Sequence, residues 1–325
     1  MSFELFDGWK NSIDDILKSR FNGMYSNQLK TDLDGRAVIV TKDGKSIKMA
    51  HKTPIFSLVR SYKMDLNLKN KVIIVTGGAK GIGEGIAEVL GTEGAIVAIV
   101  GRNEADNQLT VDKIVAANGQ AFSVIAELTQ PEDCKNAIAQ VAQKYGRIDG
   151  LVNNAGVNDG VGLENGSYEG FVASLHRNLI HYYLMAQHAL PYLKESKGSI
   201  LNIGSKTAET GQGGTSAYAA SNGGRNALTR EWAVELLKYG IRVNAVVVAE
   251  CFTPLYEKWI ETLPNPQEKL KEIEAKIPLE NRMTTAEEIA NAVAFLLSSK
   301  SSHTTGQLVY VDGGYVHLDR ALANA

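Results

Sequence analysis

Short apolar runs recur along the chain at intervals that favour alternating strands and helices. Runs near residues 72, 95, 120, 149, 199, 242 and 307 predict seven buried strands. Helical patterns that begin near residues 82, 104, 132, 168, 216 and 285 lie between or after them. This alternation is typical of a parallel sheet covered by helices on both faces, so we expect an α/β fold with a doubly wound, Rossmann-like sheet of seven strands.

The first 63 residues do not belong to this alternation. Their pattern predicts an amphipathic helix over residues 6–21 and a hairpin in which residues 38–41 and 46–49 flank a turn at 42–45. A segment of this size is too short for a secure core of its own. We expect an N-terminal extension over residues 1–63 and one domain over residues 64–325. Two explanations of the extension stay open: it is a segment that docks on that domain, or it results from a reading frame extended upstream.

A glycine-rich turn, Thr76-Gly77-Gly78-Ala79-Lys80-Gly81-Ile82-Gly83, follows the first strand of the main domain. Gly77 and Gly81 can adopt backbone conformations that other residues avoid, and Gly83 lets the next helix lie close to the strand. Amide donors at the N-terminus of that helix would then face a pyrophosphate. The turn alone also fits an ordinary connection, so the nucleotide interpretation depends on the motifs that follow.

The second strand of the domain ends at Gly101-Arg102, where the adenosine ribose of a dinucleotide would lie. No acidic residue follows at once to hold the free 2′-hydroxyl of NAD, whereas cations at Arg102 and Lys80 suit the 2′-phosphate of NADP. Both could also be ordinary surface cations. We expect NADP as the cofactor, with NAD as the alternative.

Three further motifs follow in order: residues 153–156 (Asn-Asn-Ala-Gly) after a buried strand, Gly204-Ser205 after another, and Tyr218 thirteen residues later. With the glycine turn and Asn178, they resemble the short-chain dehydrogenase/reductase family over roughly residue 64 to the C-terminus. Within that family, six segments are similar to bacterial L-fucose dehydrogenases, which oxidise the anomeric carbon of an aldose to a lactone: residues 150–160, 177–183, 205–208, 210–213, 228–233 and 311–320.

The resemblance implies a catalytic set of Ser205, Tyr218, Asn178 and the residue at Asn222. Tyr218 would be the base, and Ser205 would hold the reacting hydroxyl. Family members carry a lysine where this chain has Asn222. A free tyrosine has a pKa near 10, so only about one in a thousand is phenolate at neutral pH, and a nearby cation raises that fraction. Asn222 cannot supply the charge, although its amide could hydrogen-bond a ribose hydroxyl.

Two cations could compensate for the missing lysine. Arg225 lies seven residues beyond Tyr218 on the same helix face, and Lys206 directly follows Ser205. Because Arg225 lies two turns from Tyr218, we expect a surface residue instead. We expect Lys206 to be a structural or substrate contact.

The remaining site residues follow from the resemblance and from position. Residues 255–278 form a charged, aromatic-bearing segment of lid character. Substrate hydroxyls are expected to meet Ser205, Tyr218, Gln212, Glu250 and Tyr256, although the last three could each be merely structural. The expected cofactor contacts are Gly77, Lys80, Gly81, Ile82, Gly83, Arg102, Leu128, Asn154, Ala155, Gly156, Tyr218, Asn222 and Thr253.

Composition narrows the class of protein. A net charge of −2 suggests no nucleic-acid partner, and the chain shows no apolar stretch of membrane-spanning length. Two cysteines and an acidic start unlike a signal peptide favour a cytoplasmic protein. The six histidines show no metal-ligand spacing, so no metal is expected. The resemblance further implies a homo-oligomer, a tetramer or dimer, built through the helices near 168 and 216.

Three functions fit these patterns. The first is an NAD(P)-dependent dehydrogenase of L-fucose or a related aldose. The second is a dehydrogenase or reductase of another small polyol or ketone. The third is a dinucleotide-binding protein whose catalysis is impaired by Asn222. A purely binding role has no need of a positioned Ser205 and Tyr218, which argues against the third.

Overall fold

The computed structural model describes residues 25–31, 37–41, 46–48 and 64–319. The chain divides into two compact units, Met1–Asp65 and Leu66–Ala325. The first unit contains an antiparallel sheet of β1 (Tyr25–Thr31), β2 (Ala37–Thr41) and β3 (Ser46–Lys48). Ile39 pairs with Ile47, so the predicted hairpin is confirmed. Strand β1 was not predicted, and the helix predicted over residues 6–21 lies outside the described residues.

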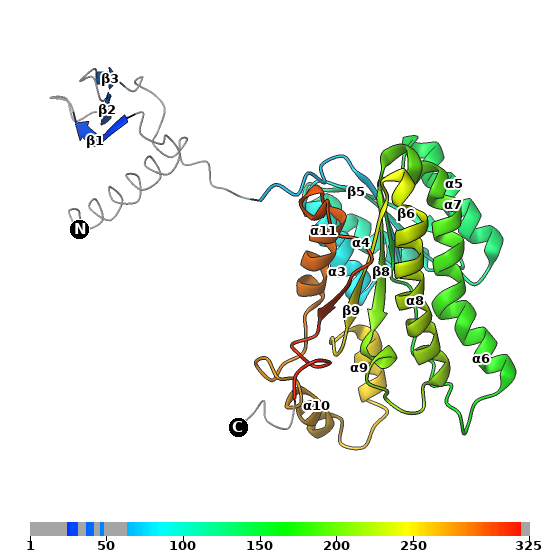
Figure 1. Cartoon of the computed structure of the whole chain (residues 1–325). Helices are drawn as coiled ribbons and strands as arrows, with labels where there is room; N and C mark the ends of the chain where they lie inside the picture. Colours follow the sequence, from blue (N-terminus) through cyan, green and yellow to red (C-terminus); the bar gives the residue numbers. More distant parts are fainter. Residues whose placement is uncertain (1–24, 32–36, 42–45, 49–63, 320–325) are drawn as a thin grey trace. The chain divides into compact units, whose positions relative to one another are not determined.

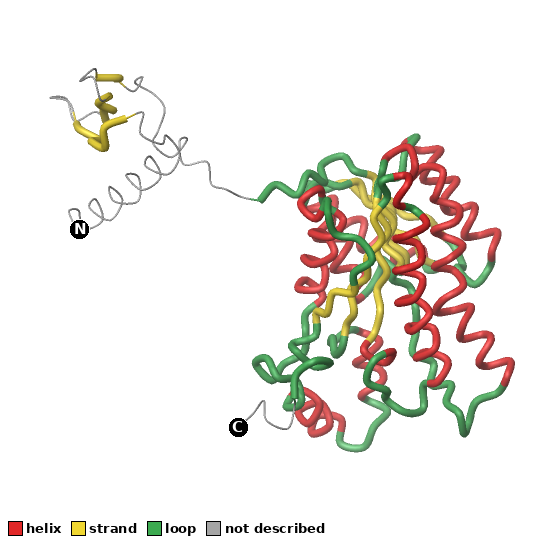
Figure 2. Tube along the Cα trace, viewed as in Figure 1, coloured by secondary structure: helices red, strands yellow, loops and turns green. Residues whose placement is uncertain are grey.

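A seven-stranded parallel sheet forms the centre of the second unit (Figures 1 and 2). Its order is β10-β9-β8-β7-β4-β5-β6, which confirms the predicted doubly wound, Rossmann-like fold. Most strands are apolar and buried along their length because helices cover both faces. The strands are β4 (Val72–Thr76), β5 (Ile96–Gly101), β6 (Gln120–Ile125), β7 (Gly150–Asn153), β8 (Ser199–Ser205), β9 (Arg242–Val248) and β10 (Leu308–Val311).

Two hydrophobic cores lie on opposite faces of this sheet. Helices α3, α4 and α11 cover one face, and α5, α7 and α8 cover the other (Figure 1). The helices are α3 (Gly81–Thr92), α4 (Glu104–Ala116), α5 (Pro131–Tyr145), α6 (Tyr168–Leu175), α7 (His181–Ser196), α8 (Ser216–Glu235), α9 (Pro254–Ile260), α10 (Pro266–Glu274) and α11 (Ala286–Leu297), with short turns η2 (Lys206–Ala208), η3 (Leu237–Tyr239) and η4 (Ser299–Ser301). In the described part of the chain, no helix is both long and apolar enough to cross a membrane.

The long helix predicted near residue 168 is not regular. A π-helical turn, η1 (His176–Ile180), separates α6 from α7. Such wide turns often occur at functional sites, because they redirect backbone groups that a regular helix would use. Asn178 lies inside this turn, and its carbonyl oxygen accepts a hydrogen bond from another helix.

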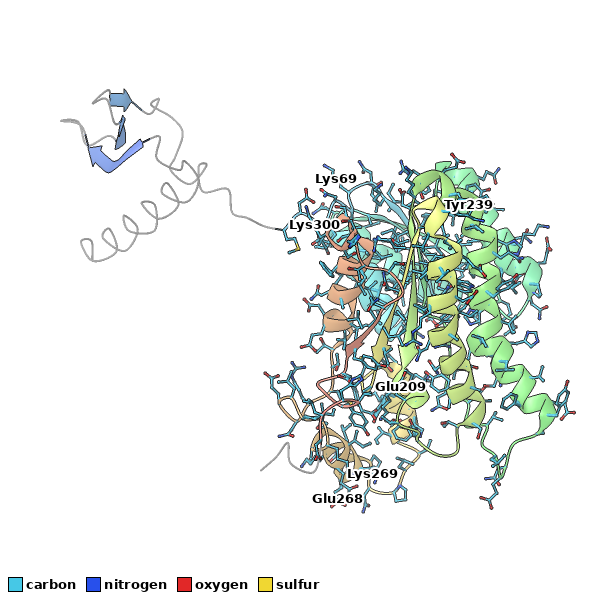
Figure 3. All side chains as sticks on the ribbon, in the orientation of Figure 1. Lys69, Glu209, Tyr239, Glu268, Lys269 and Lys300 are labelled. Carbon is cyan, nitrogen blue, oxygen red and sulfur yellow. The ribbon has the colours of Figure 1, made fainter. Side chains whose placement is uncertain are left out.

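The strand order reverses between β4 and β7, and in such folds ligands bind beyond the carboxyl ends of the strands at that reversal. In Figure 3, Lys69 and Lys300 mark the side of the sheet opposite to the carboxyl ends of the strands. Glu209 marks the carboxyl edge, and Glu268 and Lys269 mark α10, which lies beyond it (Figure 3). Helices α9 and α10 occupy most of the segment expected to be a lid.

Candidate active site

A cavity of about 1130 Å³ opens at the carboxyl edge of the sheet. Residues after several parallel strands line it, including Gly77 after β4, Asn154 after β7 and Ser205 at the end of β8. The volume slightly exceeds the usual range for a drug-sized ligand, which suits a dinucleotide together with a substrate.

The glycine turn between β4 and α3 has the shape that a pyrophosphate requires. Gly77 and Gly81 have φ angles of 63° and 57°, which side chains disfavour. A Cβ atom on Gly83 would collide with the carbonyl oxygen of Gly77 and the amide of Asn154. The Asn154 amide donates to the carbonyl oxygens of Thr76 (2.9 Å) and Gly77 (3.1 Å), tying β7 to the turn. The first amides of α3 have no partner within the helix and are available to an anion.

Two ion pairs lie where the turn meets β5. Lys80 contacts Asp106 at 2.7 Å, and Arg102 contacts Glu127 at 3.6 Å. All four side chains line the cavity, as does Leu128. Burial disfavours the charge of Glu127, but hydrogen bonds from Thr129 and the nearby Arg102 outweigh it and lower its pKa. The two carboxylates were missed because each is distant in sequence from the cation it pairs with: Asp106 lies on α4, well beyond Lys80, and Glu127 follows β6, well beyond Arg102.

Ser205 and Tyr218 both line the cavity, Ser205 at the end of β8 and Tyr218 in the first turn of α8. The Ser205 hydroxyl oxygen accepts hydrogen bonds from the Thr207 amide (3.3 Å) and the Thr207 hydroxyl (3.2 Å). Its own hydrogen is therefore available to a substrate oxygen. The two expected chemical groups are thus brought into one space.

Asn178 and Asn222 are fully buried and do not line the cavity. The Asn178 side-chain oxygen accepts from the amide of Val157 (2.8 Å), which fixes the chain after β7. The Asn222 amide donates to the carbonyl oxygen of Tyr218 (2.9 Å), and its oxygen accepts from Arg225 (3.0 Å). The structure thus directs the Asn222 amide to the protein backbone, whereas the sequence suggested a ribose contact.

Arg225 is buried, with 3% of its surface exposed, so the expectation of a surface residue was wrong. It lines the cavity together with Tyr218. Asn222, Asn226 and Thr229 on the same face of α8 are buried too. A polar stripe on a helix normally indicates the face toward solvent, so the sequence contains no signal that this stripe points inward.

Both the lid and the residues just before it line the cavity. Thr253 caps α9, and its side chain would touch a Cβ atom placed on Gly81, at 3.1 Å, so the lid begins against the glycine turn. Tyr256 lines the cavity, and its buried hydroxyl has no hydrogen-bond partner among the described residues. Burial, followed by the Glu250 carboxylate, raises the pKa of Tyr256. Gln212 is exposed on the loop before α8 and is not part of the cavity lining.

Lys206 forms a buried ion pair with Glu250, and its ammonium lies 4.0 Å from the centre of the Tyr315 ring. Lys206 is 8% exposed. This cluster links the turn η2, directly after β8, to the loop after β9 and the segment after β10. Ser205 and Tyr256 line the cavity, whereas Lys206 and Glu250 are not part of its lining. Lys206 is therefore a structural or substrate contact as expected, and its charge is matched by Glu250. Within the described residues, no group of three or more histidine, cysteine or acidic side chains is arranged to hold a metal.

Comparisons with known proteins agree with this geometry. A family model described as enoyl-(acyl carrier protein) reductase matches residues 77–316. The 3-oxoacyl-(acyl-carrier-protein) reductase FabG of Thermotoga maritima is 36% identical over 253 residues, covering 77% of this chain and all of the relative. The L-fucose dehydrogenase of Bos taurus is 33% identical over 252 residues, covering 77% of this chain and 91% of the relative.

Among solved structures, that of Cj0485 dehydrogenase is similar, with a TM-score of 0.76 and 49% identity over 80% of this chain and 99% of the other. The relatives are oxidoreductases that act on CH–OH groups with NAD(P). The cavity brings together the glycine turn, Ser205 and Tyr218. The chain belongs to the short-chain dehydrogenase/reductase family and is an NAD(P)-dependent oxidoreductase.

Proposed function

We propose that the protein oxidises the anomeric hydroxyl of an aldose, L-fucose or a close relative, to the lactone with NADP as hydride acceptor. The observation that carries this proposal is the polar cluster of Lys206, Glu250 and Tyr256. Tyr256 lines the same cavity as Ser205, and Glu250, which pairs with Lys206 outside the lining, lies next to Tyr256. A ketone or acyl substrate presents few hydroxyls, whereas a sugar needs several donors and acceptors around it. The name of the bovine relative supports the same substrate class.

In this proposal, Ser205 and Tyr218 share the reacting oxygen. The Ser205 hydroxyl, which already accepts two hydrogen bonds from Thr207, donates its hydrogen to that oxygen. Tyr218, as phenolate, takes the proton from the same hydroxyl while the C–H bond breaks and the carbon–oxygen double bond forms. Bound nicotinamide supplies the acceptor for the hydride. Proton and hydride leave together, so the enzyme needs no oxidant besides the cofactor.

The cluster at the substrate end would select the sugar. Glu250 is held by Lys206, which leaves carboxylate lone pairs for sugar hydroxyls, and Tyr256 offers a free hydroxyl. A site built to hydrogen-bond hydroxyl groups rejects analogues that lack them, since its buried polar groups are then left unpaired. We therefore expect poor turnover of simple alcohols and ketones.

NADP is proposed because the two cations at the adenosine end are only loosely held. Their partners are Asp106 and Glu127, yet 58% of the Lys80 side chain and 80% of the Arg102 side chain are exposed. Exposed ion pairs contribute little, about 0–1 kcal/mol each. A 2′-phosphate with nearly two negative charges would displace the carboxylates from both cations.

The test is a panel of aldoses, polyols and cyclic ketones with both cofactors, monitored by absorbance of the reduced nicotinamide. We expect aldoses to be oxidised with the largest kcat/KM, and Glu250→Gln to raise KM for the sugar more than it lowers kcat. Turnover of ketones or simple alcohols in preference to sugars would overturn the substrate assignment. Binding of the cofactor without turnover of any panel member would favour the non-catalytic alternative.

A further inference from the structure

The guanidinium of Arg225 is a buried charge with no carboxylate among its hydrogen-bond or ion-pair partners in the described part of the chain. It has five N–H donors. Nε donates to the carbonyl oxygen of Asn178 (2.7 Å), and Nη1 donates to the carbonyl oxygen of Ile203 (3.1 Å) and to Asn222 (3.0 Å). Nη2 is buried and has no hydrogen-bond partner in the described part of the chain. Two donors of a buried cation are therefore left over, which is costly unless a ligand uses them.

The free Nη2 faces the cavity wall at Gly156. A Cβ atom on Gly156 would lie 2.9 Å from Nη2, so any larger residue at this position would crowd that nitrogen. Gly156 and Arg225 both line the cavity. A cofactor lying against the Asn-Asn-Ala-Gly segment would thus find an unpaired cationic donor beneath it.

Among the residues that the structure describes, no carboxylate forms an ion pair with Arg225 to cancel its charge. On α7, burial, followed by the charge of Arg225, lowers the pKa of His181 to about 4, so this ring is neutral. Burial raises the pKa of Tyr182 to about 12, and the guanidinium lies 4.3 Å from the centre of its ring. The Tyr218 ring centre is 6.0 Å away. Glu127, the one carboxylate whose charge acts on His181, is paired with Arg102.

We propose that Arg225 is the cation of the active site: its charge favours the phenolate of Tyr218, and its Nη2 donates to an oxygen of the bound cofactor. Asn222, in the position of the family lysine, acts as a positioning residue that holds Nη1. The inference rests on the proposed function only in that Tyr218 is the base. A nearby opposite charge favours the ionised form of a titrating group, and the guanidinium carbon of Arg225 lies 6.0 Å from the centre of the Tyr218 ring.

An arginine changes the pH behaviour that a lysine would give. A guanidinium stays charged at every pH that proteins tolerate, whereas a buried ammonium can lose its proton. The rate should therefore rise with the ionisation of Tyr218 and then stay level on the alkaline side. No second ionisation should switch the cation off.

The first experiment is Asn222→Asp, a nearly isosteric change that places a carboxylate on Nη1. Because the new ion pair cancels the charge, the ionisation of Tyr218 should move upward by about one unit, a tenfold loss of phenolate at neutral pH. The chain has 12 tyrosines, so the phenolate of Tyr218 is measured as the ultraviolet difference between each variant and the same variant carrying Tyr218→Phe. This titration needs neither substrate nor cofactor, so it can succeed even if no sugar is oxidised.

The second experiment keeps the test valid if Asn222→Asp does not fold. Arg225→Gln removes the charge while retaining donors, and it should shift the titration and the pH profile of kcat in the same direction and weaken cofactor binding. The double variant Asn222→Lys with Arg225→Ala returns the cation to the family position and should bring the pH profile back toward that of the parent. A titration and a pH profile that stay unchanged in Asn222→Asp or Arg225→Gln would overturn the proposal.

Arg242 provides the matched control. It also donates to several main-chain carbonyl oxygens, including those of Leu296 (2.7 Å) and Ser298 (3.1 Å), but it does not line the cavity. Arg242→Gln should lower stability and leave the titration of Tyr218 unmoved. If Arg242→Gln shifted that titration as much as Arg225→Gln, the effect would be general loosening and the proposal would fail.

Discussion

Replacement of Arg102 by alanine should separate the two cofactors. In the parent, the Arg102 guanidinium lies 3.6 Å from Glu127, and 80% of its side chain is exposed. Two charges about 4 Å apart interact by about 1 kcal/mol in water and about 4 kcal/mol near a protein surface. Because Arg102 is exposed, the energy of its contact with a phosphate should lie in the lower part of this range. Without Arg102, the unpaired Glu127 carboxylate would also repel the phosphate. We expect kcat/KM for NADP to fall about tenfold, or about 1.4 kcal/mol.

The same change should barely affect NAD, which has a hydroxyl in place of the 2′-phosphate. The measurement is kcat/KM for both cofactors at two salt concentrations, since screening weakens exposed charge contacts. Only the NADP value should depend on salt in the parent, and that dependence should shrink in Arg102→Ala. Glu127→Gln is the control, because it removes the competing carboxylate and should leave NADP unchanged or improved. A parent that prefers NAD, or an equal loss for both cofactors, would refute the two-cation argument.

Four further outcomes are expected. Tyr218→Phe should abolish turnover yet retain cofactor binding measured by nicotinamide fluorescence; lost binding would mean a structural role. Gly83→Ala should remove cofactor binding by its collision with the turn, whereas Gly223→Ala, in open space on α8, should raise stability by about 0.5–1 kcal/mol. Burial lowers the pKa of His181 to about 4 in the folded protein, from 6.5 for an exposed histidine. Between these two pH values the unfolded chain binds a proton at His181 that the folded protein does not, so the free energy of unfolding, measured by denaturant titration, should fall by up to about 3 kcal/mol from pH 6.5 to 4. A His181→Gln variant with the same pH slope would contradict that assignment. We propose that residues 64–325 fold alone, so deletion of residues 1–63 should leave a cofactor-binding protein, and an insoluble product would show otherwise.

The fold was predictable because its signals are local. Most strands of the parallel sheet are short apolar runs, and helices begin within two residues of each of the six predicted starts, although α7, α9 and α10 were not predicted as separate helices. The glycine turn was readable for the same reason, since its backbone angles demand particular residues. Such features depend on neighbours in sequence.

The electrostatics of the site were not predictable, because they depend on side chains that meet only in the folded chain. Arg102 looked like an unopposed cation until the end of β6 brought Glu127 beside it. Arg225 looked remote from Tyr218 along the helix, yet its long side chain folds back to the carbonyl oxygens of Asn178 and Ile203. The π-helical turn that frees the Asn178 carbonyl oxygen leaves no periodic pattern in the sequence. The direction in which a long arginine side chain extends leaves none either.

The hydrogen bond between Asn222 and Arg225 also constrains how this protein can change over generations. A lysine at position 222 in the present chain would set two cations side by side in a buried space, which is strongly unfavourable. Loss of the arginine while asparagine remains would leave no cation in that space. Either step alone passes through an impaired intermediate, so the two positions should vary together among descendants. A library of single substitutions would therefore score both positions as intolerant. Only a library that varies both positions together would reveal that lysine at position 222 can replace the arginine at position 225.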